Sequence, residues 1–120
     1  MGLINYHNKR FVSIENTSNG EVSIKTFFDY RQEGQIVTAT YSGGQIIQGM
    51  LIGLVKVDGS LEFRYNHVNR NNELRGGFCR STPEILPDGR IRLHENWTWM
   101  DIERTAGSSI VEEVIHELDY

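Results

Sequence analysis

Short turn signals divide this sequence at intervals that leave no room for crossover helices. Roughly ten to seventeen residues separate one signal from the next, which is enough for one strand each. Val, Ile, Thr, Phe and Tyr are frequent between the signals, and these residues suit a pleated sheet. The spacing therefore predicts an antiparallel meander. The signals, which tolerate the positive φ of tight hairpin turns, are Asn19-Gly20, Glu33-Gly34, Gly43-Gly44, Asp58-Gly59, Asn71-Asn72 and Asp88-Gly89.

Two-residue turns at these signals bring the apolar side chains onto one face of the predicted sheet. Opposed residues of neighbouring strands share a face, so the pairing can be followed from hairpin to hairpin. No helix is predicted to cover this face, so the sheet has to curl around it. We therefore predict an all-β fold, an antiparallel up-and-down meander of about eight strands closed into a small barrel of the avidin and lipocalin (calycin) type. The predicted inner face contains Thr26, Phe28, Tyr30, Val37, Ala39, Tyr41, Met50, Ile52, Leu54, Phe63, Tyr65, Phe78, Trp97 and Trp99.

Three segments fit the meander less directly. In the first strand, Lys9 to Asn16, apolar residues occur in both alternating series, so either face can point inward. Pro83 cannot donate to a ladder, which predicts a bulge or break near Ser81 to Glu84. Ser108 to Tyr120 has apolar spacing that also suits a helix. Its β-branched residues and the need to close the barrel favour a final strand.

The composition predicts a single domain, residues 1–120, large enough to bury a core without disulfide or metal. A net charge of −4 argues against a nucleic-acid partner, and no run of about 18 apolar residues predicts a membrane span. Met1 to Arg10 lacks the apolar core of a signal peptide. Cys79 is the only cysteine, which fits the cytoplasm. No metal-ligand spacing occurs, and no cofactor is predicted.

The predicted inner face also carries ionisable side chains, which is typical either of a polar core network or of a ligand cavity. A two-residue turn at Asp88-Gly89 puts Arg80 opposite Trp97 and diagonal to Glu95. Arg80 and Glu95 then form a buried structural pair or present charge to a ligand. We expect the mouth near Tyr41, His67 and Trp99, at the end of the barrel with the longer connections. The predicted cavity-lining residues are Tyr41, Tyr65, His67, Phe78, Arg80, Glu95, Trp97 and Trp99.

The fourth predicted strand has apolar residues on its predicted outer face as well. Ile47, Leu51 and Val55 form a strip there, more apolar than a monomer usually exposes. We therefore expect a homo-oligomer built on the third to fifth strands.

Two longer runs carry a resemblance. The run GQIVTATYSGG at 34–44, and STPEILPDGRIRLHE at 81–95 with Trp97, resemble a family of small uncharacterised bacterial proteins. The resemblance covers most of the chain and implies a bacterial origin. Such proteins often carry the label N-acetylglutamate synthase, which implies an acetyl-CoA-dependent N-acetyltransferase.

Three classes of function remain open from the sequence. An acetyltransferase needs a helix N-terminus to cradle the pyrophosphate, whereas Gln45 to Met50 lies in a predicted strand, so an enzyme is the least favoured class. Aromatic walls with a few convergent polar groups favour a barrel that binds a small apolar or aromatic molecule. A structural or interaction module with a filled core is the main alternative.

Overall fold

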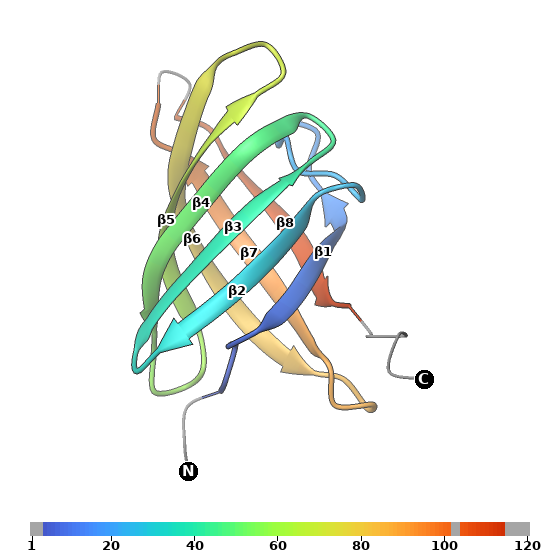
Figure 1. Cartoon of the computed structure of the whole chain (residues 1–120), viewed down its shortest axis with the longest axis vertical. Coiled ribbons are helices and arrows are strands. Elements are labelled where there is room, and N and C mark those ends of the chain that lie inside the picture. Colours follow the sequence, from blue (N-terminus) through green and yellow to red (C-terminus); the bar gives the residue numbers. More distant parts are fainter. Residues whose placement is uncertain (1–3, 102–103, 115–120) are drawn as a thin grey trace.

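The computed structural model describes residues 4–101 and 104–114, and these form one closed barrel of eight strands (Figure 1). Each strand pairs antiparallel with the next, and the last pairs with the first. The predicted all-β meander and its closure are therefore confirmed. No helix among the described residues is long and apolar enough to cross a membrane. The strands are β1 (Lys9–Asn16), β2 (Phe27–Glu33), β3 (Ile36–Gly43), β4 (Ile46–Val55), β5 (Leu61–Asn69), β6 (Leu74–Ile85), β7 (Ile91–Trp99) and β8 (Ala106–Glu113).

The final strand is confirmed over the part of the C-terminal segment that the structure describes. β8 closes the barrel against β1, with Asn16 opposite Ser109. The rest of the predicted segment, 115–120, lies outside the described residues.

The segment before β1 lies at the end of the barrel that holds the β2–β3, β4–β5 and β6–β7 hairpins (Figure 1). Tyr6 is fully buried there, and its hydroxyl donates a hydrogen bond to the carbonyl of Gly59 at 2.6 Å. Its ring lies 6.5 Å from that of Phe11 and 6.2 Å from that of Tyr30, measured between centroids. Tyr6 therefore acts as a plug, and the open space of the barrel lies toward the other end.

Three hairpins have three-residue loops where two-residue turns are predicted. In each, the backbone closes around the loop, as in the bond from the Lys56 amide to the Ser60 carbonyl at 2.8 Å. The last loop residue is Gly59, Asn72 or Gly89, with φ of 88°, 61° and 91°. This is the loop in which a type I turn is followed by a left-handed residue. Because side chains alternate, each extra residue reverses the face that the next strand turns inward.

The predicted orientation of β4 is wrong. Met50 and Ile52 are 57% and 61% exposed, and Leu54 is exposed as well, whereas Leu51 and Val55 are buried. The cause lies in the β3–β4 hairpin, where Gly43 pairs with Ile46 and the register then shifts, so that Tyr41 faces Gly49. The Gly43-Gly44 turn is thus irregular and reverses the strand that follows it. The exposed apolar side chain predicted at Ile47 is confirmed.

The predicted orientation of β6 is also wrong, while that of β7 is confirmed. The β5–β6 loop has one residue more than predicted, so Cys79 and Ser81 are buried and Phe78 and Arg80 point outward. The β6–β7 loop adds a second residue, which cancels the first error. Glu95 therefore faces the interior, as do Trp97 and Trp99.

The structure also shows which face of β1 points inward and how β6 accommodates Pro83. On β1, Phe11 and Ser13 point inward, and the register with β8 shifts between Ser13 and Glu15. The predicted break near Ser81 to Glu84 is wrong, because β6 continues to Ile85. The pairing of β5 with β6 ends at Ser81, so Pro83 lies at a free edge, which is where sheets tolerate proline.

Candidate functional site

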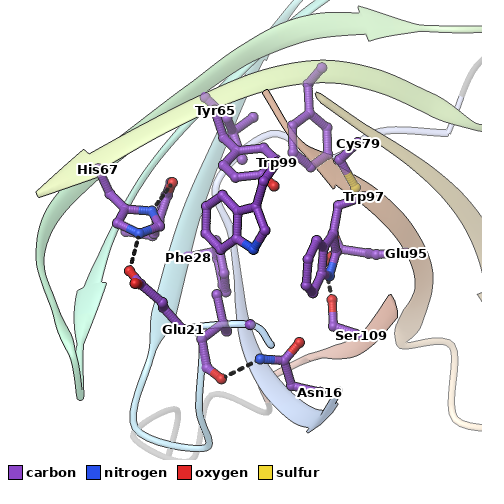
Figure 2. A pocket seen from close by; sticks show the side chains of 15 residues that line it. Asn16, Glu21, Phe28, Tyr65, His67, Cys79, Glu95, Trp97, Trp99 and Ser109 are labelled. Carbon is purple, nitrogen blue, oxygen red and sulfur yellow. Dashed lines mark hydrogen bonds and ion pairs between the residues drawn. The ribbon is translucent and has the colours of Figure 1, made fainter. Parts of the chain in front are cut away.

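A small cavity of about 40 Å³ lies inside the barrel, at the end beside the long loop between β1 and β2 (Figure 2). Phe78 and Arg80 do not line it, because both point outward from β6. Six of the eight predicted cavity residues do line it: Tyr41, Tyr65, His67, Glu95, Trp97 and Trp99. Seven further lining residues were not predicted from the sequence: Asn16, Gly20, Glu21, Val22, Leu51, Cys79 and Ser109.

Aromatic rings form most of the cavity wall. Trp97 and Trp99 lie edge to face at 5.5 Å between centroids, and Tyr65 meets Trp99 in the same way at 5.7 Å. Gly49 leaves space for this wall, since a Cβ atom there would lie 2.5 Å from the Tyr41 ring and 2.7 Å from Cβ of His67. The arrangement gives an apolar lining with several edges and faces on which a ring can stack.

Glu95 is the buried acid of the cavity. The Ser81 hydroxyl donates to its Oε2 at 3.1 Å, and the Ser109 hydroxyl donates to its Oε1 at 3.0 Å. Burial raises the pKa of Glu95 to about 7, although the two hydroxyls oppose this rise. The predicted pair with Arg80 is wrong, because Arg80 is 63% exposed and binds Glu62 at 2.9 Å on the outside of the barrel.

His67 lies at the mouth, where it joins β5 to the β1–β2 loop. Its Nε2 is 2.8 Å from Oε1 of Glu21, and its Nδ1 is 3.0 Å from the Tyr41 hydroxyl. Burial lowers the pKa of His67, and the Glu21 carboxylate opposes this shift. The ring is therefore neutral. Its Nε2 donates a hydrogen bond to Glu21, and its Nδ1 accepts one from the Tyr41 hydroxyl.

Glu21 also contacts two further side chains of the barrel. Arg75 Nη1 lies 3.0 Å from Glu21 Oε2, and Asn69 Nδ2 donates to the same oxygen at 3.1 Å. The Arg75 guanidinium lies over the Trp99 ring at 4.1 Å and binds Asp101 through Nε. Glu21 thus ties the β1–β2 loop across the mouth. The sequence offers no signal for this role, since Glu21 lies in an irregular loop.

Asn16 leaves one polar atom unused beside the cavity. Its Nδ2 donates to the Val22 carbonyl at 2.7 Å, which fixes the orientation of the amide. Its Oδ1 is buried and has no hydrogen-bond partner among the described residues. Figure 2 shows the amide below Trp97 and Trp99, at the edge of the cavity. A buried acceptor without a partner costs free energy until a donor reaches it.

Within 4–101 and 104–114, no group of three or more His, Cys, Asp or Glu side chains is placed to hold a metal ion. Burial raises the pKa of the Cys79 thiol well above its usual range, so this cysteine is a poor nucleophile.

The comparisons with known proteins agree with the geometry. Neither the curated proteins nor the solved structures contain a match. A family model described as "Avidin-like protein" matches residues 4–114, which is nearly the whole chain and every strand of the barrel. By this match and by its closed eight-stranded barrel, the chain belongs to the avidin-like family.

Proposed function

We propose that this protein binds a small apolar or aromatic molecule in the interior of its barrel and catalyses no reaction on it. One observation carries the proposal: the cavity joins aromatic walls to a few polar groups that converge on it. Such sites hold a ligand through apolar contact and orient it through the polar groups. Here these groups are Glu95, His67 and the unpaired Oδ1 of Asn16.

The proposal requires the cavity to enlarge when a ligand enters. A volume of about 40 Å³ holds water rather than a ring. Enlargement can come from the β1–β2 loop, whose Gly20, Glu21 and Val22 line the cavity without belonging to a strand. The same small volume favours the second candidate, a structural or interaction module whose core is filled by its own side chains.

A neutral fluorescent probe, N-phenyl-1-naphthylamine, separates the two candidates. Cys79→Leu adds bulk to the cavity wall, and we expect it to weaken binding of the probe by about tenfold or more, or roughly 1.4 kcal/mol. Phe78→Leu is the matched control, because Phe78 is the neighbouring residue on β6 and points outward. We expect the affinity of this control for the probe to stay within about twofold of the parent's, a difference of less than roughly 0.5 kcal/mol.

Fluorescence titration at constant protein concentration gives the three affinities. No saturable binding by the parent protein would support the filled core. Unchanged affinity in Cys79→Leu would show that the probe binds outside the cavity.

We also propose that the protein assembles with a second copy of itself through the outer face of β3, β4 and β5. Of the three residues predicted for this strip, Ile47 is exposed, whereas Leu51 and Val55 are buried. The outer face also exposes Ile36, Met50, Ile52 and Leu54. The patch runs along β4, and Ile36 of β3 faces Leu54 beside it. Polar side chains, Thr38 and Arg64, flank Ile52 on the two neighbouring strands.

A further inference from the structure

The Glu21 carboxylate occupies a set of donors that has the form of a carboxylate-binding site. Its Oε1 is 2.8 Å from Nε2 of His67, and its Oε2 is 3.0 Å from Nη1 of Arg75. Asn69 Nδ2 lies 3.3 Å from the first oxygen and 3.1 Å from the second. Both carboxylate oxygens therefore meet two donors each, one of them on a charged guanidinium, and charge-assisted bonds of this kind are the stronger ones.

Contacts that do not involve Glu21 hold each donor in place. The Tyr41 hydroxyl fixes the His67 ring through Nδ1 at 3.0 Å. The Asn69 oxygen accepts hydrogen bonds from the backbone amides of Asn71 and Glu73 at 3.0 Å each, so the β5–β6 loop holds this side chain in place. Arg75 is positioned by Asp101 and by the Trp99 ring. The site therefore keeps its shape when Glu21 leaves.

Glu21 itself is delivered by a segment outside the sheet. It lies between β1 and β2, whereas the donors belong to β5 and β6. Other hydrogen bonds also hold the loop, such as those from Asn16 Nδ2 to the Val22 carbonyl and from Trp99 Nε1 to the Asn19 carbonyl. Neither of these two involves the carboxylate site. A carboxylate from elsewhere can therefore replace Glu21 without breaking a strand pairing.

Two other acids among the described residues, Asp101 and Glu73, lie beside the site and have partners there. Asp101 binds Arg75 through Nε, on a different nitrogen from the one that meets Glu21. The Glu73 carboxylate accepts from Asn69 Nδ2 at 2.9 Å, beside the site. These two acids repel an incoming anion, but they already stand beside the Glu21 carboxylate. An exchange of one carboxylate for another leaves the local charge unchanged.

We propose that His67, Asn69 and Arg75 form a carboxylate subsite at the mouth, that Glu21 occupies it in the absence of ligand, and that the barrel's small-molecule ligand carries a carboxylate that displaces Glu21. This inference rests on the proposed binding of an apolar molecule in the cavity. It identifies that molecule as an amphipathic acid, with its apolar body among the Trp and Tyr rings and its carboxylate on Arg75. His67 and Trp99 border both parts, with ring centroids 5.8 Å apart.

Carboxylate rescue of a Glu21→Ala variant tests the subsite. The probes are 3-phenylpropanoate, its neutral amide 3-phenylpropanamide, and acetate, each titrated by calorimetry at constant ionic strength. We expect 3-phenylpropanoate to bind Glu21→Ala at least about tenfold more tightly than it binds the parent, because Glu21 competes in the parent. We expect the amide to bind Glu21→Ala at least about tenfold more weakly than the acid.

Three further variants control the experiment. Glu73→Ala removes a carboxylate that also contacts Asn69 but does not occupy the subsite, and it should bind the acid as the parent does. Glu21→Gln keeps the shape of the side chain and serves if Glu21→Ala does not fold. Arg75→Gln in the Glu21→Gln protein should remove the preference for the acid over the amide.

The outcomes distinguish this inference from the proposed function. Equal affinity of acid and amide for Glu21→Ala overturns the subsite but leaves the apolar cavity standing. Saturable acetate binding with no further gain from the phenyl group supports the subsite and overturns binding in the cavity. Absence of carboxylate binding to both Glu21 variants overturns the subsite, whatever the neutral fluorescent probe shows.

Discussion

Glu95 is the residue whose titration most directly couples the cavity to stability. Its pKa is raised from 4.5 to about 7 by burial, so the folded protein holds a proton that the unfolded chain has released between these pH values. Stability therefore falls as pH rises through this window. Glu95→Gln keeps the shape and cannot ionise. We expect its unfolding free energy to equal the parent's near pH 4 and to exceed it by about 3 kcal/mol near pH 8.

Urea unfolding at both pH values measures this difference. Glu33→Gln is the control, because Glu33 is an exposed carboxylate at the end of β2. The control should leave the parent's pH profile unchanged. A Glu95→Gln profile that runs parallel to the parent's across this range would contradict the buried acid.

The alternation of side chains along the strands was enough to predict six of the cavity residues. It failed on β6, where one additional loop residue exchanges the inward and outward faces of the strand. Tyr65 and His67 follow from the Phe63 series on one strand. Arg80 was misplaced because its strand starts one residue later than a two-residue turn requires. Glu21 and Asn16 could not be predicted, because their roles depend on a long loop that crosses the mouth, and loops of this kind have no periodic pattern.

At the scale of elements, the three-residue loops set the register of half the barrel. Gly89 ends the β6–β7 loop at φ 91°, and nothing lies within 4 Å of a Cβ atom built there. Gly89→Ala therefore tests the backbone alone. We expect it to lower the unfolding free energy by about 1–2 kcal/mol, because an L side chain resists the left-handed conformation. Gly89→Asn should cost less, because asparagine tolerates that conformation more readily.

Equilibrium unfolding in urea compares the two variants with the parent. A loss of the same size for Ala and Asn would contradict backbone strain as the cause, because Asn tolerates the left-handed conformation better than Ala does. No loss for either would contradict the observed loop conformation.

The existence of each hairpin was predictable, whereas its length was not. Asp58-Gly59 and Asp88-Gly89 mark turns correctly, but the same pair serves both a two-residue turn and the end of a three-residue loop. Pro87 offered the missing signal, because proline suits the first position of a type I turn. The β3–β4 irregularity at Tyr41 to Gly43 had no comparable signal. The errors in successive hairpins cancelled. The barrel was therefore predicted correctly, although the inward and outward faces of β4 and β6 were exchanged.

For the whole molecule, the outer face of β4 predicts assembly. Ile52 lies at the centre of the exposed apolar patch and is 61% exposed. If two copies meet there, Ile52→Glu places a charge in the interface, and we expect the sedimentation coefficient to fall from that of an oligomer to that of a monomer. The fold should survive, because the side chain contributes nothing to the core.

Thr98→Glu is the matched control for assembly. Thr98 is an exposed residue on β7, on a different side of the barrel, and the change adds the same charge. This variant should sediment as the parent does. A parent protein that is monomeric at micromolar concentration would end the proposal.

The seam between β1 and β8 also governs how the chain reaches its fold. Every other pairing joins consecutive strands, but this one joins the two ends of the sequence, so it has the highest loop-closure cost and forms slowly. β1 pairs with β2 only from Lys9 to Val12, so Ser13 to Asn16 await β8. During synthesis these residues present an open strand edge until the last strand emerges, and open edges attract other chains. Aggregation is therefore a hazard of the nascent chain, and closure of the seam ends it.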